Sequence, residues 1–197
     1  MSEVIKYCYP LSFGALLNWG QVQGYRIILV PIGYAEEVGI FSTIANIGSV
    51  GMNAVSQIYS QQFTPSIYKT NGKSVGKYLL GSFLVISIVT IFGYLFGEYL
   101  VSHLTNSTFT NHWIIIIFGI LIDGFNLMIG SLIIYITITS SPSKLIIPFL
   151  LSIIVMIITI CILYTINNIY ISTIGIPLLT AQITMLIYLL WFYNYEK

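Results

Sequence analysis

The sequence predicts an all-α integral membrane protein with six transmembrane helices. Of its 197 residues, 57% are hydrophobic and 7% are charged, against about 25% charged residues in an ordinary soluble domain. The mean hydropathy is +0.92. The apolar runs are long enough for membrane helices and lack the strict alternation of barrel strands. This composition is therefore that of a protein embedded in a lipid bilayer.

Six apolar segments follow one another, and we expect residues 1–197 to form a single six-helix transmembrane bundle. The first span covers residues 9–32 and starts at Pro10, because the first helical turn tolerates the missing N–H of proline. The second is expected to stop before Pro65. Pro177 is expected to kink the first half of the last span. The second to sixth spans are predicted at residues 39–63, 78–101, 113–138, 145–166 and 172–192.

The lysines predict the orientation of the spans, because positively charged loops stay in the cytoplasm. All the lysines lie on one side of the predicted bundle, and the opposite loops carry no lysine or arginine. We therefore expect a multi-pass protein of the bacterial cytoplasmic (inner) membrane with both termini in the cytoplasm. The lysines are Lys6, Lys69, Lys73, Lys77, Lys144 and Lys197.

The second span carries a polar stripe at spacings of three and four residues, which places its members on one helix face. Small polar residues also serve helix packing in membranes, and the serines fit that alternative. The amides Asn46, Asn53 and Gln57 are larger and more costly to desolvate, so they indicate the wall of a polar cavity. The stripe consists of Ser42, Asn46, Ser49, Asn53, Ser56 and Ser60, widened by Thr43 and Gln57.

The first span has a similar face, formed by Asn18, Gln21 and Tyr25, with Arg26 about 80° round from Asn18. Arg26 lies about 24 Å along the helix from Pro10, in the outer third of a hydrocarbon core of about 30 Å. Two roles are open for Arg26. It either snorkels to the outer headgroups, or it faces the cavity and binds an anionic substrate, because a guanidinium holds a phosphate bidentately.

Asp123 is the only acidic residue well inside a predicted span, and an intramembrane carboxylate points to function. Three roles are open for it: coupling to a proton or a sodium ion, an ion pair with Arg26, or a structural hydrogen bond to a neighbouring helix.

Motifs of catalysis and of metal binding are missing from the sequence. His103 and His112 have no cysteine or carboxylate at ligand spacing, and no phosphate loop or Ser/His/Asp order is present. We therefore expect a protein that is not an enzyme and that binds no metal or cofactor. The net charge of +1 argues against nucleic acid as a partner.

An ordered set of motifs in residues 5–78 resembles a known transporter family. The motifs are Tyr9-Pro10-Leu11-Ser12, Asn18-Trp19, Tyr25-Arg26-Ile27-Ile28-Leu29, Glu37-Val38-Gly39-Ile40-Phe41-Ser42 and Phe63-Thr64-Pro65-Ser66-Ile67-Tyr68-Lys69. Their order and spacing resemble the seventh and eighth helices of Wzx-type polysaccharide (O-antigen unit) flippases of the MOP exporter superfamily. Tyr25 departs from the family, which often has Asp there. A carboxylate on another helix would then have to neutralise the charge of Arg26, and Asp123 is the candidate.

The resemblance implies the C-terminal half of a twelve-helix MOP/MATE-like transporter, with two six-helix bundles around a central cavity. It implies the flipping of a polyprenyl-pyrophosphate-linked oligosaccharide to the periplasmic leaflet, in the biosynthesis of O-antigen, a part of lipopolysaccharide, or of another surface polysaccharide. The partners would be this lipid-linked oligosaccharide, membrane lipids, and a missing N-terminal half or a partner chain. Without that half or partner we expect no transport. The expected substrate-binding residues are Asn18, Gln21, Tyr25, Arg26, Asn46, Asn53 and Gln57, and Asp123 is the candidate for ion coupling.

Two alternatives stay open. One is half of a MATE-like drug/cation antiporter, which would need more acidic residues in its cavity than Asp123 supplies. The other is a non-transporting membrane fragment or subunit. Drug resistance that depends on Asp123 would favour the antiporter.

Overall fold

The computed structural model describes residues 2–196, apart from the side chains of residues 2–7, 11, 107 and 196, and this part of the chain contains helices and no strand. The two short 3₁₀ turns lead directly into the helices that follow them. The elements are α1 (Ser2–Leu29), α2 (Ala35–Lys69), α3 (Val75–Leu104), α4 (Ser107–Thr110), η1 (Trp113–Ile115), α5 (Ile116–Thr139), η2 (Pro142–Leu145), α6 (Ile146–Thr165) and α7 (Gly175–Glu196).

Five helices of the described chain are long and apolar enough to cross a bilayer: α2, α3, α5 with its 3₁₀ turn, α6 with its 3₁₀ turn, and α7. The prediction of an all-α, multi-pass membrane protein is confirmed at this level. Helix α1 is not among the five, because Asn18, Gln21, Gln23 and Arg26 interrupt its apolar sequence. It nevertheless packs along α6. A sixth span at α1 therefore stays a prediction.

The structure differs from the sequence prediction at three prolines. Helix α1 begins at Ser2 and continues through Pro10, and α2 continues through Pro65 to Lys69. A proline inside a helix removes one hydrogen bond, which membrane helices tolerate when their neighbours satisfy the freed carbonyl. Pro177 lies in the first turn of α7, where the backbone N–H groups have no helical acceptor, so it interrupts no hydrogen bond of that helix.

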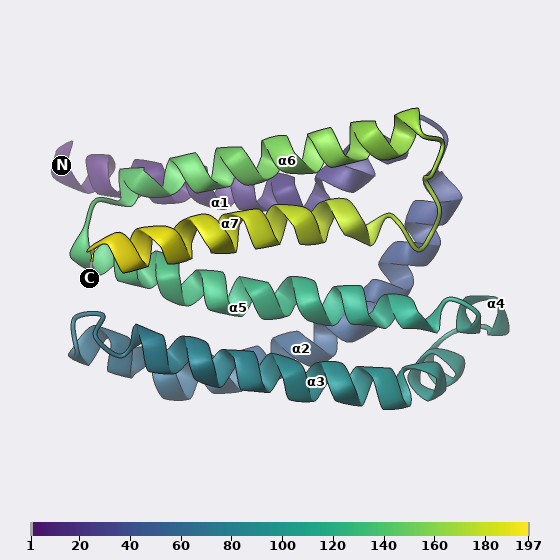
Figure 1. Cartoon of the computed structure of the whole chain (residues 1–197), viewed down its shortest axis with the longest axis horizontal. Coiled ribbons are helices and arrows are strands. Elements are labelled where there is room, and N and C mark those ends of the chain that lie inside the picture. Colours follow the sequence, from purple (N-terminus) through teal and green to yellow (C-terminus); the bar gives the residue numbers. More distant parts are fainter. Residues whose placement is uncertain (1, 197) are drawn as a thin grey trace.

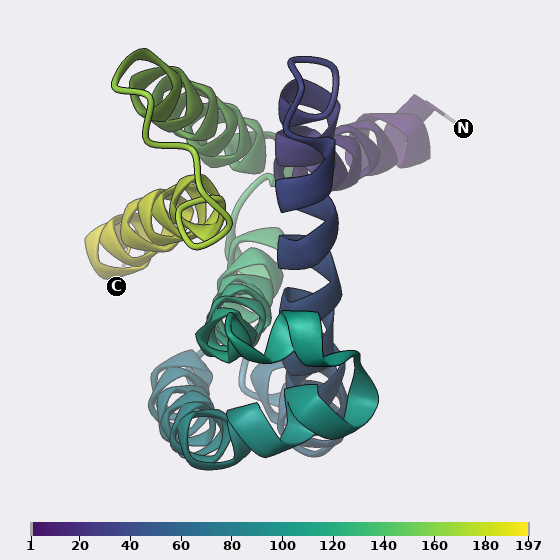
Figure 2. The same ribbon diagram turned by 90° about the vertical axis from the view of Figure 1, so that its right-hand side faces the viewer.

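The long helices form a row with two helices on one side of it. Helices α3, α5, α7 and α6 lie next to one another in that order (Figure 1). Seen end-on, with the helices of the row pointing toward the viewer, α1 and α2 lie on one side of the row, and α2 crosses α5 obliquely (Figure 2). The α1–α2 side is therefore distinct from the side that α3, α6 and α7 present.

The described lysines gather at one end of this bundle. The turn between α2 and α3 and the connection between α5 and α6 lie at the same end as the two termini (Figure 1). Lys73 lies in the first of these connections, between Lys69 at the end of α2 and Lys77 in the first turn of α3, and Lys144 lies in η2, in the second connection. Lys197 and the side chain of Lys6 lie outside the described residues. This arrangement agrees with the predicted distribution of charge, while the side of the membrane on which the lysines lie stays a prediction.

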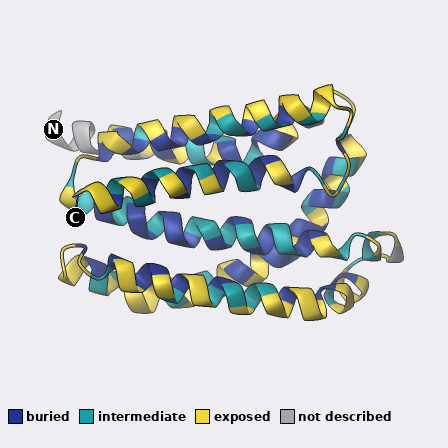
Figure 3. Cartoon of the chain, in the orientation of Figure 1, coloured by how far each residue is buried: buried dark blue, intermediate teal, exposed yellow. Residues whose placement is uncertain are grey.

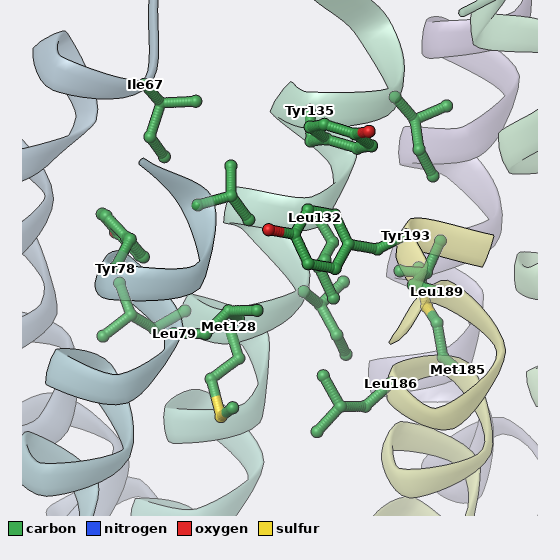
Figure 4. Packing of buried hydrophobic residues seen from close by; sticks show 14 of the residues in the cluster. Ile67, Tyr78, Leu79, Met128, Leu132, Tyr135, Met185, Leu186, Leu189 and Tyr193 are labelled. Atoms are coloured by element: carbon green, nitrogen blue, oxygen red, sulfur yellow. The ribbon is translucent and has the colours of Figure 1, made fainter. Parts of the chain in front are cut away.

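Helix α5 is the centre of the buried core. Near the lysine end, Leu132 of α5 is buried in one cluster with Ile67 of α2, Leu79 of α3 and Leu189 of α7 (Figure 4). A second cluster toward the opposite end joins α2, α5, α6 and α7 and contains Phe41, Ile44, Ile116, Met156 and Ala181. The polar residues of α5 are thus held between two apolar layers.

Helices α2 and α5 cross at two glycines. Gly48 of α2 packs against the carbonyl of Ile116, and Gly119 of α5 packs against the carbonyl of Ala45. A Cβ atom on either glycine would overlap the opposing oxygen. Small residues of this kind let the backbones of membrane helices approach closely. This contact sets the register of α2 against α5, and with it the position of the α2 stripe relative to Asp123.

Candidate functional site

Asp123 is the centre of a hydrogen-bond network that joins three helices. From α2, the Ser49 hydroxyl and Asn53 Nδ2 both donate to Asp123 Oδ2, the second over 2.9 Å. From α5 itself, Asn126 Nδ2 donates to Oδ1 over 3.5 Å. Gln182 Nε2 of α7 then donates to Asn126 Oδ1 over 3.1 Å. The carboxylate is therefore held by hydrogen bonds, the third of the roles predicted for it.

Arg26 does not reach the Asp123 carboxylate in the described structure. Its Nε donates to the Tyr25 hydroxyl over 2.9 Å, and its guanidinium carbon lies 5.6 Å from the centre of the Tyr25 ring. Arg26 is exposed, whereas Tyr25 is 4% exposed. The structure thus lacks the predicted ion pair, since the guanidinium is turned to its neighbour on α1. Its two terminal nitrogens remain for a ligand.

Arg26 and Asp123 nevertheless line one cavity, which we call the polar cavity. It lies between α1, α2 and α5 and has a volume of about 130 Å³. Helix α2 contributes Ser42, Asn46 and Ser49 to its wall. The polar cavity therefore brings one cation, one carboxylate and several neutral donors together between the helices.

The predicted residues of α2 remain accessible in this structure. Asn46 is exposed and lines the polar cavity, while Asn53 is exposed and donates to Asp123. Gln57 is exposed farther along the helix and lies outside the polar cavity. Ser49 and Ser56, which fit the packing alternative in the sequence, are partly buried. The stripe therefore divides into serines toward the bundle and amides away from it.

The predicted residues of α1 separate into three environments. Tyr25 and Arg26 line the polar cavity. Gln21 is 1% exposed and lies between α1 and α6, where its Oε1 accepts a hydrogen bond from the Ser152 hydroxyl over 2.9 Å. Asn18 lines a second cavity between α1 and α5. Gln21 is thus placed in a helix interface in this structure and not on the cavity wall.

The exposed amides of α2 contrast with the exposed residues of other helices. Exposed positions cover the outward sides of α3 and α6, while α5 between them is largely buried (Figure 3). Most of the large exposed side chains of α3 and α6 are hydrocarbon, as expected for contact with lipid, and polar exceptions such as Tyr94, Glu98, Tyr99 and Tyr164 lie toward the ends of the two helices. The hydrocarbon side chains include Leu80, Leu84, Ile88, Ile91 and Leu95 of α3 and Ile147, Ile154, Ile158 and Ile162 of α6. The amide row of α2 consists of Asn46, Asn53, Gln57 and Gln61.

Sequence reasoning missed Gln182 as a member of the Asp123 network. It is an isolated amide in the apolar sequence of α7, the same signal that indicates Asn46 and Asn53 in α2. Asn126 shares a helix face with Asp123 but is not among the predicted site residues. Both omissions concern hydrogen bonds within the bundle.

In the part of the chain that the structure describes, no group of three or more His, Cys, Asp or Glu side chains is placed to hold a metal ion. Fold and site together define a multi-pass, all-α membrane protein in which a cavity holds both Arg26 and Asp123. Comparison with protein-family models, with curated proteins and with solved structures finds no match to this chain.

Proposed function

We propose that this chain forms one half of a transporter that flips a polyprenyl-pyrophosphate-linked oligosaccharide across the cytoplasmic membrane, in the biosynthesis of O-antigen or another surface polysaccharide. The observation that carries the proposal is the exposed amide row of α2, whose member Asn46 lines the polar cavity together with Arg26. Unpaired amides in hydrocarbon are costly, so this row requires water, a polar ligand or a second polar surface. The motif order of residues 5–78 is the additional support for this family of transporters.

The chemistry of the α1–α2 side suits the two polar parts of such a lipid. Amides such as Asn46 and Gln57 donate and accept hydrogen bonds, as sugar hydroxyls require. A guanidinium carries five N–H donors in a fork that matches phosphate oxygens, and Arg26 uses one of them for Tyr25. The pyrophosphate therefore binds at Arg26 and the sugars bind along α2, while the hydrocarbon stays among apolar surfaces.

Asp123 supplies a means of coupling this binding to an ion. Asp123 and Arg26 line the same small cavity, so an ionised carboxylate repels a phosphate held there, and repulsion between like charges is strong in a medium of low dielectric constant. A proton or a sodium ion on Asp123 removes that repulsion. Loading of the ion and binding of the pyrophosphate then favour each other, which is a reciprocal coupling of the two sites.

The α1–α2 side is one wall of a pathway, and a second wall completes it. In this proposal the second wall is an N-terminal six-helix half or a partner chain, and rocking of the two halves alternately opens the cavity to each side of the membrane. Purified protein without that second half is expected to move no substrate across vesicle membranes.

Substitution of Arg26 tests the proposed binding site. In cells that depend on this protein, Arg26→Ala is expected to reduce surface polysaccharide more than tenfold, because hydrogen bonds to a charged group contribute about 2 kcal/mol and a tenfold change corresponds to about 1.4 kcal/mol. Arg26→Lys is expected to retain part of the function, since it keeps the charge and loses the fork. The measurement is the amount of surface polysaccharide per cell at equal protein levels.

The neighbouring Ile27→Ala is a suitable control, because Ile27 is 58% exposed and lies outside the polar cavity. Normal polysaccharide in Arg26→Ala and also in the double variant Asn46→Ala/Asn53→Ala would refute binding of substrate at this face.

A further inference from the structure

A second cavity follows the polar cavity along α1 and α5. This second cavity, which we call the apolar cavity, has a volume of about 310 Å³. Pro10, Gly14 and Asn18 of α1 line the apolar cavity, and Val22 and Arg26 line the polar cavity. These residues recur at every fourth position, and each step turns the helix by about 40°, so the row winds round α1 between Pro10 and Arg26. The two cavities follow one another along α1, and together we call them the track.

Helix α5 continues the same track on the opposite wall. Gly119 and Asp123 line the polar cavity, while Asn126, Gly130 and Ile133 line the apolar cavity. Their spacing of three and four residues places them on one face. One face of α5 therefore lines both cavities.

Polarity changes in one direction along this track. Arg26 and Asp123 mark the polar part, and the amides Asn18 and Asn126 mark the end of the apolar cavity that is nearest to it. Asn126 already donates to Asp123 and accepts from Gln182, so it requires no polar ligand. The remaining wall is hydrocarbon or glycine: Pro10, Gly14, Ala15, Ile129, Gly130, Ile133, Leu145 and Phe149.

The volume and lining of the apolar cavity suit a hydrocarbon chain. Cavities of about 150 Å³ with walls of Leu, Ile and Phe bind benzene and stay free of water, and the apolar cavity is about twice as large. Asn18 and Arg26 are eight residues apart, which corresponds to about 12 Å along α1. A few isoprene units span that distance, so one molecule can occupy both cavities.

We propose that the apolar cavity binds the first isoprene units of the lipid whose pyrophosphate lies at Arg26. This inference rests on the proposed function, which supplies the anionic end of the molecule. With the lysine end in the cytoplasm, the pyrophosphate lies toward the outer surface and the chain runs through the centre of the bilayer toward the lysine end, where Pro10 and Leu145 line the cavity. That is the orientation of a lipid in the outer leaflet. The track therefore holds the lipid after its head group has crossed the membrane.

Gly130→Leu tests the apolar cavity. A Cβ atom on Gly130 has no neighbouring atom within 4 Å, and Gly130 lines the apolar cavity, so a leucine side chain there starts in free space and occupies part of that cavity. Gly51→Leu on α2 is the matched control, because a Cβ there also meets nothing within 4 Å and Gly51 lines neither cavity. The probes are farnesyl pyrophosphate, inorganic pyrophosphate and farnesol, bound to the full chain in detergent micelles, and equal thermal unfolding of the variants establishes that they are folded.

Gly130→Leu is expected to weaken the binding of farnesyl pyrophosphate about tenfold, which corresponds to the lost burial of about two methylene groups. It is expected to weaken the binding of farnesol by a similar factor and to leave the binding of inorganic pyrophosphate unchanged. Gly51→Leu is expected to change the binding of none of the three probes. Equal binding of farnesyl pyrophosphate by Gly130→Leu and Gly51→Leu would overturn the assignment of the apolar cavity. Competition by a dipalmitoyl phospholipid as effective as that by farnesyl pyrophosphate would overturn the choice of an isoprenoid.

The same experiment separates this inference from the proposed function. Arg26→Ala is expected to weaken the binding of farnesyl pyrophosphate and of inorganic pyrophosphate, but not the binding of farnesol. If Arg26→Ala changes no binding while Gly130→Leu still weakens farnesol, the proposed pyrophosphate site fails and the hydrocarbon site is supported.

Discussion

Gly119→Ala is expected to destabilise the protein by about 3 kcal/mol, near the upper end of the usual cost of overpacking. The new Cβ atom would overlap the Ala45 carbonyl and also crowd the Ser49 backbone nitrogen. A backbone cannot rotate away as a flexible side chain does, so α2 and α5 must separate. That separation would also pull Ser49 from Asp123. Unfolding of the purified protein in detergent, by heat or by denaturant, measures the effect.

Gly51→Ala is the control for this prediction, because a Cβ atom on Gly51 meets nothing within 4 Å and alanine favours helix over glycine. Gly48→Ala, at the same crossing, is expected to behave like Gly119→Ala. The double variant should cost less than the sum of the two, since one separation of the helices relieves both overlaps. A Gly119→Ala protein as stable as the Gly51→Ala protein would contradict the close crossing of α2 and α5.

Asp123→Ala is expected both to destabilise the protein by about 2 kcal/mol and to abolish its function. Alanine leaves Ser49, Asn53 and Asn126 without their shared acceptor, and a lost hydrogen bond to a charged group costs about 1.5 to 3 kcal/mol. Asp123→Asn keeps a carbonyl acceptor for these donors and removes the charge. It is therefore expected to fold with a smaller loss of stability and still to lose ion-coupled transport.

Comparison of the two Asp123 variants separates the structural role from the coupling role. Unfolding in detergent reports the first, and surface polysaccharide at equal protein levels reports the second. Glu98→Gln is the matched control, because Glu98 is an exposed acid of α3 outside the Asp123 network. Full function of Asp123→Asn would show that the carboxylate has no coupling role, and unchanged stability of Asp123→Ala would show that the network does not stabilise the bundle.

Periodicity and composition were sufficient to predict the helices and the polar stripe. The membrane helices α2, α3, α5, α6 and α7 overlap the predicted ranges, because long apolar segments have few alternatives in lipid. Local preference predicts that helices begin at Pro10 and end before Pro65, yet α1 and α2 continue through these prolines. Packing against neighbouring helices outweighs the loss of one hydrogen bond.

The contents of the site were less predictable than the helices that carry it. A helical wheel places Gln21 and Tyr25 on one face, yet only Tyr25 lines the polar cavity, because α6 covers Gln21. The bond between Ser49 and Asp123 depends on the register that Gly48 and Gly119 set between α2 and α5. Rotation and register of packed helices follow from contacts between distant segments, which the periodicity of a single segment does not contain.

The leaflet distribution of lipid-linked oligosaccharide in cells that lack this protein tests the proposed flipping most directly. Deletion is expected to make polyprenyl-pyrophosphate-linked oligosaccharide accumulate in the cytoplasmic leaflet, where enzymes or lectins added to the periplasmic side do not reach it. Restoration of the protein should return that oligosaccharide to the outer leaflet. If cells without the protein expose as much lipid-linked oligosaccharide on the outer leaflet as cells that have it, the protein is not the flippase.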